Sequence, residues 1–402
     1  MNADPADLAP TRAAPVEPPL PTAERLRAAV WACRVQFACL GMLGGAWGVH
    51  VPSAKAHFEL DEAALSGLLL AAAIGAMLCL LFAGRLVARL GVRGAARITV
   101  LLVAGSLAAL LVLPSFGLAL VAMLLFGASS SLFDMAINAE GTAIEAISGR
   151  AVMSGLHGMF SLGGMVGAGV SAALLHAGMP PALQLASLAA AVGALAWLSA
   201  RRMLDAHPAS EGDEAHFAWP RGPLLLIGLL ILAGMTAEGV MYDWSVLYMK
   251  QELLQPQAFA ALGYMSFSAA MAATRFAGDR LRERLPQRTL LGGGAGLAAV
   301  AMAVVLLSAH PWVAIAGFAV VGAGLATVVP ILYNAATLVP GTSRAAAIAA
   351  ASSIGYGGFL LGPPLIGAIA HGSSLTLALG VLVLSAATLA LCARFVPAAP
   401  GR

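Results

Sequence analysis

Charged residues are absent from long stretches of this 402-residue chain, and the lengths of these stretches restrict its fold more than any other feature. A helix of about 20 apolar residues crosses a bilayer core about 30 Å thick. A run near 20 residues therefore predicts one spanning helix, and a run near 50 predicts two helices joined by an uncharged turn. The charge-free runs are 35–54, 63–84, 98–133, 151–200, 222–237, 253–274, 289–343 and 345–393. Since the run from 222 continues through two acids to about Tyr248, we expect one, one, two and two helices in each half, twelve in all.

The composition agrees with a membrane protein. Hydrophobic residues make up 60% of the chain and charged residues only 10%, whereas a soluble domain carries about 25% charged residues. This excludes an ordinary cytosolic enzyme, a disordered chain and a nucleic-acid-binding protein. The long, non-alternating runs also exclude a β-barrel. The cysteines form no CxxC pair and lie among apolar residues, which predicts free thiols and no metal site at Cys33, Cys39, Cys79 and Cys392.

Basic residues predict the orientation of the chain. With an inside N-terminus, the outer loops hold only Lys55 and Lys250, and the other 20 basic residues lie in the inner loops and tails. This positive-inside bias predicts that both termini are cytoplasmic. Residues 1–27 contain six prolines and four acids and no basic n-region, so we expect a disordered tail and no signal peptide.

The two halves repeat at an offset of about 195 residues. Gly127-Ala128 matches Gly322-Ala323, Gly163-Gly164 matches Gly357-Gly358, and Trp47 matches Trp244. Six helices repeated in the same orientation predict two bundles related by an axis along the membrane normal. The expected organisation is a cytoplasmic tail, an N-terminal bundle, a polar cytoplasmic linker, a C-terminal bundle and a second tail, at 1–27, 28–200, 201–221, 222–396 and 397–402.

The chain resembles the major facilitator superfamily over about residues 28–396. Besides the 6+6 repeat, the resemblance rests on an arginine-rich loop motif, seen as Gly84-Arg85-Leu86-Val87-Ala88-Arg89-Leu90-Gly91-Val92-Arg93 and again as Arg275-Phe276-Ala277-Gly278-Asp279-Arg280. Ala88 replaces the acid of the motif in the first copy, and Asp279 keeps it in the second. The resemblance implies gating roles for Asp279, Arg85, Arg89 and Arg280.

Shorter segments narrow the resemblance. Phe133-Asp134-Met135-Ala136-Ile137-Asn138 is similar to the acid-x-x-x-Asn of fucose-permease-related symporters. The stretch from Leu132 to Gly164, the segment Ala237–Ser245 and Gly355-Tyr356-Gly357-Gly358 resemble the YbjJ-like inner-membrane permeases. The resemblance implies a carrier in the bacterial inner membrane, without a defined cargo.

Ionisable residues inside the spans are the candidate proton-coupling groups, because a charge inside a bilayer is costly. We expect Asp134, Arg34 and His157 to lie at similar depth, with Asn138 one helical turn from Asp134 on the same face. Arg34 and Asp134 then form either a coupling pair or a static one, and Arg34 alone could instead reach the headgroups. His157 either relays protons or only packs. For Glu140 and Glu145 we favour a solvated helix end or a loop-anchoring pair with Arg150.

The second half supplies most of the expected substrate ligands. Glu238 and Tyr242 share a helix face at i, i+4, whereas Asp243 is expected near the outer boundary in water. Trp47 and Trp244 either stack on a sugar ring at the outer cavity mouth or anchor the interface. The full set of substrate-binding candidates is Asn138, Glu238, Tyr242, Trp47, Trp244, Tyr333 and Asn334.

The expected function is secondary active transport of a small polar solute by alternating access, driven by protons. A sugar or sugar derivative is the leading cargo, by resemblance only. No Walker, HExxH or nucleophile-elbow sequence is present, so we expect neither an enzyme nor a cofactor. The expected partners are the solute, protons and lipid, with a monomeric protein. Two alternatives stay open, which are proton-coupled efflux of amphipathic compounds and a non-transporting membrane sensor or scaffold on the same fold.

Overall fold

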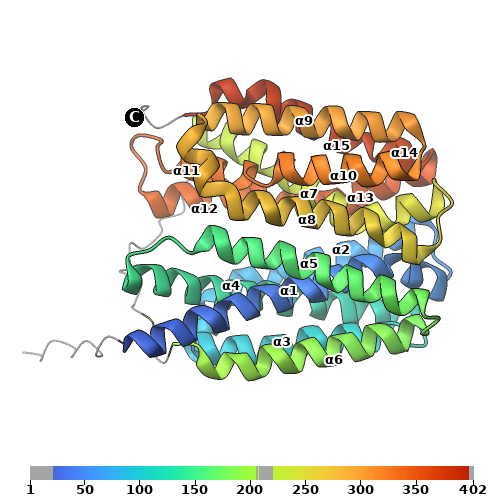
Figure 1. Cartoon of the computed structure of the whole chain (residues 1–402), viewed down its shortest axis with the longest axis horizontal. Coiled ribbons are helices and arrows are strands. Elements are labelled where there is room, and N and C mark those ends of the chain that lie inside the picture. The colour runs from blue at the N-terminus through green and yellow to red at the C-terminus, as the bar shows by residue number, and fades with distance from the viewer. Residues whose placement is uncertain (1–20, 205–206, 208–220, 398–402) are drawn as a thin grey trace, which may run out of the picture.

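The computed structural model describes residues 21–204, 207 and 221–397, without the side chains of Asp279 and Ala345. All regular structure in these residues is helical, and the helices run roughly parallel to one long axis (Figure 1). The expected tails 1–27 and 397–402 and the expected linker 201–221 lie largely outside the described residues.

Six long helices and one short 3-10 turn make up the first half of the chain. Each of the runs 98–133 and 151–200 contains the one uncharged turn expected of it, around residues 111–115 and 177–180. The first helix begins earlier than expected, at Ala23, because Thr22 caps it by accepting a hydrogen bond from the Arg25 N–H. The elements are α1 (Ala23–His57), α2 (Glu62–Leu90), α3 (Val92–Leu110), α4 (Phe116–Ser148), α5 (Met153–His176), α6 (Pro181–Ser199) and η2 (Ala200–Arg202).

The second half contains three unbroken helices followed by three spans that are each divided in two. Pro330 explains one division, because it cannot donate to the carbonyl of Ala326, where α10 ends. The elements are α7 (Pro223–Gln251), α8 (Gln257–Arg284), α9 (Gln287–Ser308), α10 (Pro311–Leu325), α11 (Val328–Ala336), α12 (Arg344–Gly355), α13 (Gly357–Gly372), α14 (Leu375–Ala378), α15 (Gly380–Cys392) and η3 (Ala393–Phe395).

Eleven segments of the described chain are long and apolar enough to cross a membrane. The remaining long helix, α8, has 28 residues but is less apolar, since it carries polar residues and an arginine-rich end. Its 18 residues from Gln257 to Thr274 carry no charge. With α8 included, the fold is the expected all-α polytopic membrane fold of twelve spans.

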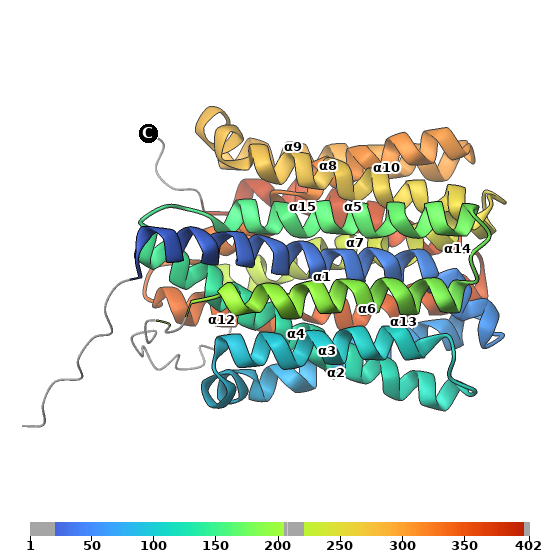
Figure 2. The same cartoon turned by 60° about the horizontal axis from the view of Figure 1, so that its bottom comes forward.

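The two helix groups meet along α5 and α8 and along α2 and α13, and α1 packs on α7. Figure 2 shows α5 beside α1, on the side where the second group lies. Gly41 and Gly163 make the α1–α5 contact possible, because a Cβ would lie 1.9 Å from the Phe160 carbonyl oxygen and 2.0 Å from that of Ala38, respectively. These two glycines therefore let the backbones of α1 and α5 approach closely.

Several contacts between the groups lie at the end of the molecule opposite the described chain termini, which we call the distal end. There Gln257 on α8 donates from Nε2 to the Val49 carbonyl and to Ser53 Oγ of α1, at 2.7 Å each. His371 Nδ1 also lies 3.7 Å from Asp61 Oδ2. At the end with the termini, the basic end, the main packing of α4, α11 and α12 is with helices of their own group.

Candidate functional site

A buried ion pair joins α7 to α8 inside the membrane. Arg275 Nη2 donates to Glu238 Oε1 at 3.1 Å, and only 12% and 13% of the two side chains are exposed. The Tyr242 hydroxyl donates to the same carboxylate oxygen at 3.0 Å, so the expected i, i+4 neighbours are in contact. Arg275 Nη1 donates to Ser161 Oγ on α5 at 2.7 Å. The guanidinium therefore links the two helix groups directly.

Aromatic rings surround this ion pair. The ring of Tyr242 packs at 5.3 Å from that of Phe267 and at 5.6 Å from that of Tyr264, both on α8. Phe160 of α5 presents its ring at 6.4 Å from Tyr242. The site thus combines one carboxylate, one guanidinium, hydroxyls and aromatic faces, which are groups that hold polar, ring-shaped ligands.

Arg275 is a functional candidate that the charge pattern assigned to an inner loop, and this assignment is wrong. The charge-free run ends at residue 274, but α8 continues to Arg284, two residues before Pro286. At 1.5 Å per residue, Arg275 lies about 14 Å from the end of its helix.

Asp134 and Arg34 form no ion pair in the described structure, which contradicts the expected pairing. The Arg34 guanidinium lies instead 5.2 Å from the ring centroid of Trp31, three residues earlier on α1. Asn138 is on α4, one turn from Asp134, but its side-chain amide donates to the Asp134 backbone carbonyl at 2.9 Å. His157 packs its ring edge against Phe37 at 5.3 Å.

The remaining substrate candidates occupy different environments. Trp47 and Trp244 are buried, at 5% and 1% exposure, so neither lies open at a cavity mouth in this structure. The Tyr333 hydroxyl accepts a hydrogen bond from Ser352 Oγ at 3.1 Å, across the division between α11 and α12. Asn334 is exposed at the basic end.

The arginines of the predicted gates lie on the surface of the basic end. Arg85, Arg89 and Arg280 are exposed at the ends of α2 and α8. The side chain of Asp279 falls outside the described residues. The gating roles of all four residues stay predictions.

Glu145 does not pair with Arg150. Its carboxylate accepts hydrogen bonds from the backbone N–H groups of Val152 at 2.6 Å and Met153 at 2.9 Å. The N-cap of α5 has no capping side chain. Glu145, at the end of α4, therefore supplies the acceptor for the unpaired N–H groups at the start of α5. The expected loop anchor exists, with backbone groups as its partners.

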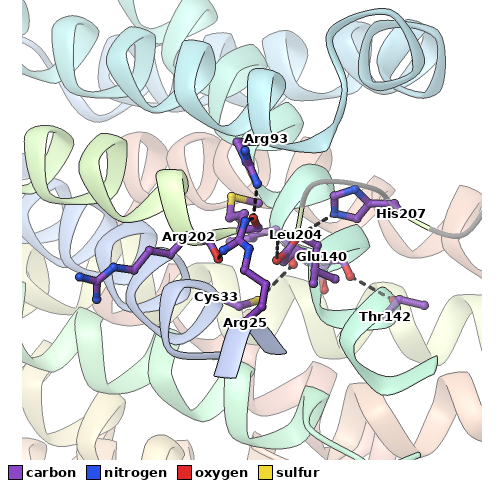
Figure 3. Close-up of polar contacts among 11 residues, drawn as sticks. Arg25, Cys33, Arg93, Glu140, Thr142, Arg202, Leu204 and His207 are labelled. Carbon is purple, nitrogen blue, oxygen red and sulfur yellow. Dashed lines mark hydrogen bonds and ion pairs between the residues drawn. The ribbon is translucent and has the colours of Figure 1, made fainter. Parts of the chain in front are cut away.

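Glu140 is fully buried, and the expectation of a solvated helix end is wrong for it. Its Oε1 accepts the Leu204 backbone N–H at 2.8 Å, and its Oε2 lies 2.5 Å from His207 Nε2 (Figure 3). Arg25 and Arg93 both donate to the Met203 carbonyl beside it. These residues, which we call the linker anchor, fasten the chain after η2 to α1, α3 and α4.

The four cysteines are unpaired, as expected. Cys33 and Cys39 are buried in α1, and Cys79 and Cys392 are half-buried on α2 and α15. Cys33 Sγ donates to the Ile137 carbonyl of α4 at 3.6 Å. The described residues contain no group of three or more His, Cys, Asp or Glu side chains that could hold a metal ion.

The family model and the sequence relative that match this chain agree with each other. The family model described as Major Facilitator Superfamily matches residues 37–337 and 224–402. A relative named as an uncharacterised MFS-type transporter of Yersinia pestis is 37% identical over 371 residues, which cover 90% of this chain and 94% of the relative.

Solved transporter structures share the fold at low sequence identity. A D-xylose–proton symporter superposes with a TM-score of 0.74 at 14% identity, covering 93% of this chain and 98% of that chain. The fucose:proton symporter of E. coli superposes with a TM-score of 0.62 at 16% identity, covering 91% and 98%. Because the family model and the 37% identical relative span most of the sequence, this membrane protein belongs to the Major Facilitator Superfamily of transporters.

Proposed function

We propose that the protein moves a small polar solute across the bacterial inner membrane by alternating access, coupled to protons. The observation that carries this proposal is the Glu238–Arg275 pair with its bond to Ser161, because it connects the two helix groups through ligands that a solute can replace. Solute hydroxyls that compete for Arg275 would weaken the link to α5 and so release one group from the other.

The aromatic rings and the hydroxyls define the kind of solute. A polyhydroxylated ring offers donors and acceptors to Glu238, Arg275 and Tyr242, and apolar C–H faces to Tyr264 and Phe160. A sugar or sugar derivative fits this set better than an amphipathic drug, which gains nothing from a buried ion pair. The two structural neighbours named above as symporters carry xylose and fucose by their titles, which supports the same class.

Asp134 is the proposed proton-coupling residue. It lies on α4 and has no paired cation among the described residues, whereas Glu238 has Arg275 beside it. A carboxylate without a partner cation takes up a proton more readily than one held in an ion pair. In this proposal Asp134 binds the proton, and Glu238 and Arg275 bind the solute.

The basic end is proposed to face the cytoplasm, as the positive-inside rule requires for its arginines. The distal contacts of Gln257 and His371 then close the outer side of the molecule. The structure corresponds in this proposal to a state closed to the outside, and opening of these contacts gives the outward-facing state.

The experiment has two stages. The purified protein is first screened by thermal shift against sugars, sugar acids, nucleosides and drugs, and a stabilising compound is then followed in radiolabelled form in proteoliposomes. With a pH gradient, the wild-type protein accumulates the compound above its equilibrium level. Glu283→Gln, which neutralises an exposed acid on α8, serves as the control and should behave as wild type.

Two variants test the roles of the two carboxylates separately. Asp134→Asn should lose uphill accumulation but keep solute exchange, and Glu238→Gln should lose binding in the thermal-shift assay by about tenfold or more. Accumulation that survives in Asp134→Asn removes this residue as the coupling site. Stabilisation by drugs but by no polar compound would favour the efflux function, and no transport of any stabilising compound would favour a sensor.

A further inference from the structure

A cavity lies at the distal end, between the ends of α1 and α7, and the proposed function does not use it. Its volume is about 360 Å³, which is within the range of small-molecule sites. Its polar lining consists of Lys55 and Glu59 near the end of α1 and of Lys250 and Gln251 at the end of α7. Lys55 and Lys250 are the only lysines in the sequence. Both lysines of the protein therefore line one cavity.

The two lysines are equivalent in the internal repeat of the chain. Lys250 follows Lys55 at the repeat offset of about 195 residues, and Gln257 follows Glu62 at the same offset. Lys55 Nζ donates to Glu62 Oε1. Lys250 Nζ likewise donates to Gln257 Oε1, at 3.0 Å. The second half therefore keeps the contact of the first half but replaces its carboxylate with an amide.

This replacement leaves the charge of Lys250 without a counter-charge. Lys55 and Glu62 form an ion pair, whereas Lys250 pairs with no carboxylate that the structure describes. Lys250 is also half-buried, so water compensates its charge only in part. An ammonium group has three donors, and Gln257 uses one of them. Two donors and one positive charge remain for an anion in the cavity.

The acids near Lys250 do not neutralise it. Glu252 accepts hydrogen bonds from two residues at the start of α14, at 2.9 and 3.0 Å. Glu59 is exposed, where water screens its charge, and it forms no ion pair with either lysine in the described structure. Asp243, which the sequence placed in water near this boundary, lies instead two turns before Lys250 on α7, where it lines a separate small cavity against α13.

We propose that the cavity at the distal end binds a small organic carboxylate, with Lys250 as its charged ligand. Hydrogen bonds from an ammonium group to a carboxylate are roughly twice as strong as neutral ones. Gln251 and Leu247 offer polar and apolar contacts to the rest of an organic anion. The lining helices α1 and α7 belong to different helix groups, and α7 is the most buried of the candidate spans. The cavity therefore lies between the groups and not on the lipid-facing surface.

The proposal goes beyond the proposed function, because it concerns a second binding site and depends neither on Glu238 nor on proton coupling. The alternative is that Gln257 serves only the contact between the helix groups. Its Nε2 donates to the Val49 carbonyl and to Ser53 Oγ, which a glutamate could not do, and Lys250 would then only orient the amide. This alternative predicts no saturable response of Lys250 to a carboxylate.

The test labels the lysines of the purified full-length protein in a neutral detergent without anionic lipid. Because the chain has only two lysines, peptide mass spectrometry follows each of them after a brief reaction with an amine-reactive ester. Lactate and D-gluconate should protect Lys250 in a saturable way, and their uncharged counterparts lactamide and sorbitol should not. Equal protection by the uncharged compounds, or by chloride or phosphate at the same ionic strength, overturns the proposal, as does no protection by either carboxylate.

Variants then change the charge balance around Lys250. Gln257→Glu restores the carboxylate of the first half and should raise the half-saturating carboxylate concentration by about tenfold or more, because an internal ion pair competes with the bound anion. Lys250→Gln should lose carboxylate binding in calorimetry, and Lys250→Arg should keep it. Arg284→Gln, which removes an exposed cation at the other end of α8, is the control. Unchanged carboxylate binding in Gln257→Glu or in Lys250→Gln, whichever of them folds, overturns the proposal.

Discussion

The Glu238–Arg275 pair places two opposite charges inside the membrane, 3.1 Å apart. Removing a charge from water costs several kcal/mol, and the partner charge offsets this cost only while both are present. Tyr242 and Ser161 add hydrogen bonds to the carboxylate and the guanidinium, respectively. The folded protein therefore tolerates the two charges together, and loss of either one should destabilise it.

Arg275→Met should lower the free energy of unfolding by about 3–5 kcal/mol, because Glu238 is left as a lone buried charge. Arg275→Met combined with Glu238→Gln should be more stable than either single variant. Denaturation of the purified proteins measures all four, and Arg280→Ala, an exposed arginine of the same helix, is the control. Single effects that simply add would mean that the two residues do not interact.

The contact between Tyr242 and Glu238 could be predicted from sequence, since positions four apart on a helix are neighbours. The partner of Glu238 could not, because the pairing of Arg275 with α7 depends on how two helices are rotated against each other. The expected Arg34–Asp134 pair failed for the same reason. Similar depth on two helices does not place two side chains on facing sides.

At the scale of helices, the breaks between spans were predictable and the breaks within spans were not. A charge-free run near twice the length of one span must contain a turn, and the turns at 111–115 and 177–180 lie inside the two long runs of the first half, as expected. The division of α10 from α11 follows from Pro330, a single residue inside a uniformly apolar run. The cap of α5 was not predictable either, because Glu145, which accepts the hydrogen bonds of its first turn, lies on another helix.

Glu145→Ala should weaken the first turn of α5 by about 1 kcal/mol, because the N–H groups of Val152 and Met153 lose their acceptor. Hydrogen exchange at these two amides should speed up accordingly. Glu145→Gln keeps a carbonyl acceptor and should show a smaller change, and Glu283→Ala should show none. Unchanged exchange at the two amides in Glu145→Ala would contradict the capping role.

For the whole molecule, the contacts between the two groups at the distal end should limit the transport cycle. Asp61 and His371 are both exposed and lie 3.7 Å apart across the groups. With the native cysteines replaced, Asp61→Cys with His371→Cys should be joined by a short cleavable cross-linker. Transport should then stop, and a reducing agent should restore it. Full turnover in the cross-linked protein would show that these ends do not separate.

The helical class and the number of spans could be derived from composition and charge spacing, because the bilayer imposes one length on every span. The family came instead from the resemblance of the repeat and the arginine-rich loop motif. The bounds of the two bundles, the orientation and the gating arginines stay predictions. Long-range contacts such as Gln257 with Val49 join residues about 200 positions apart. No periodicity in the chain encodes such a contact.

The contacts of the linker anchor can form only in the order in which the chain is synthesised. Glu140 leaves the ribosome 67 residues before its partner His207. At about 5–20 residues per second, its carboxylate waits several seconds for that partner while α5 and α6 are made. The contacts of Glu140 with Leu204 and His207 can therefore form only after translation has passed His207, so the last contacts of the first six helices are made after α6 has been synthesised.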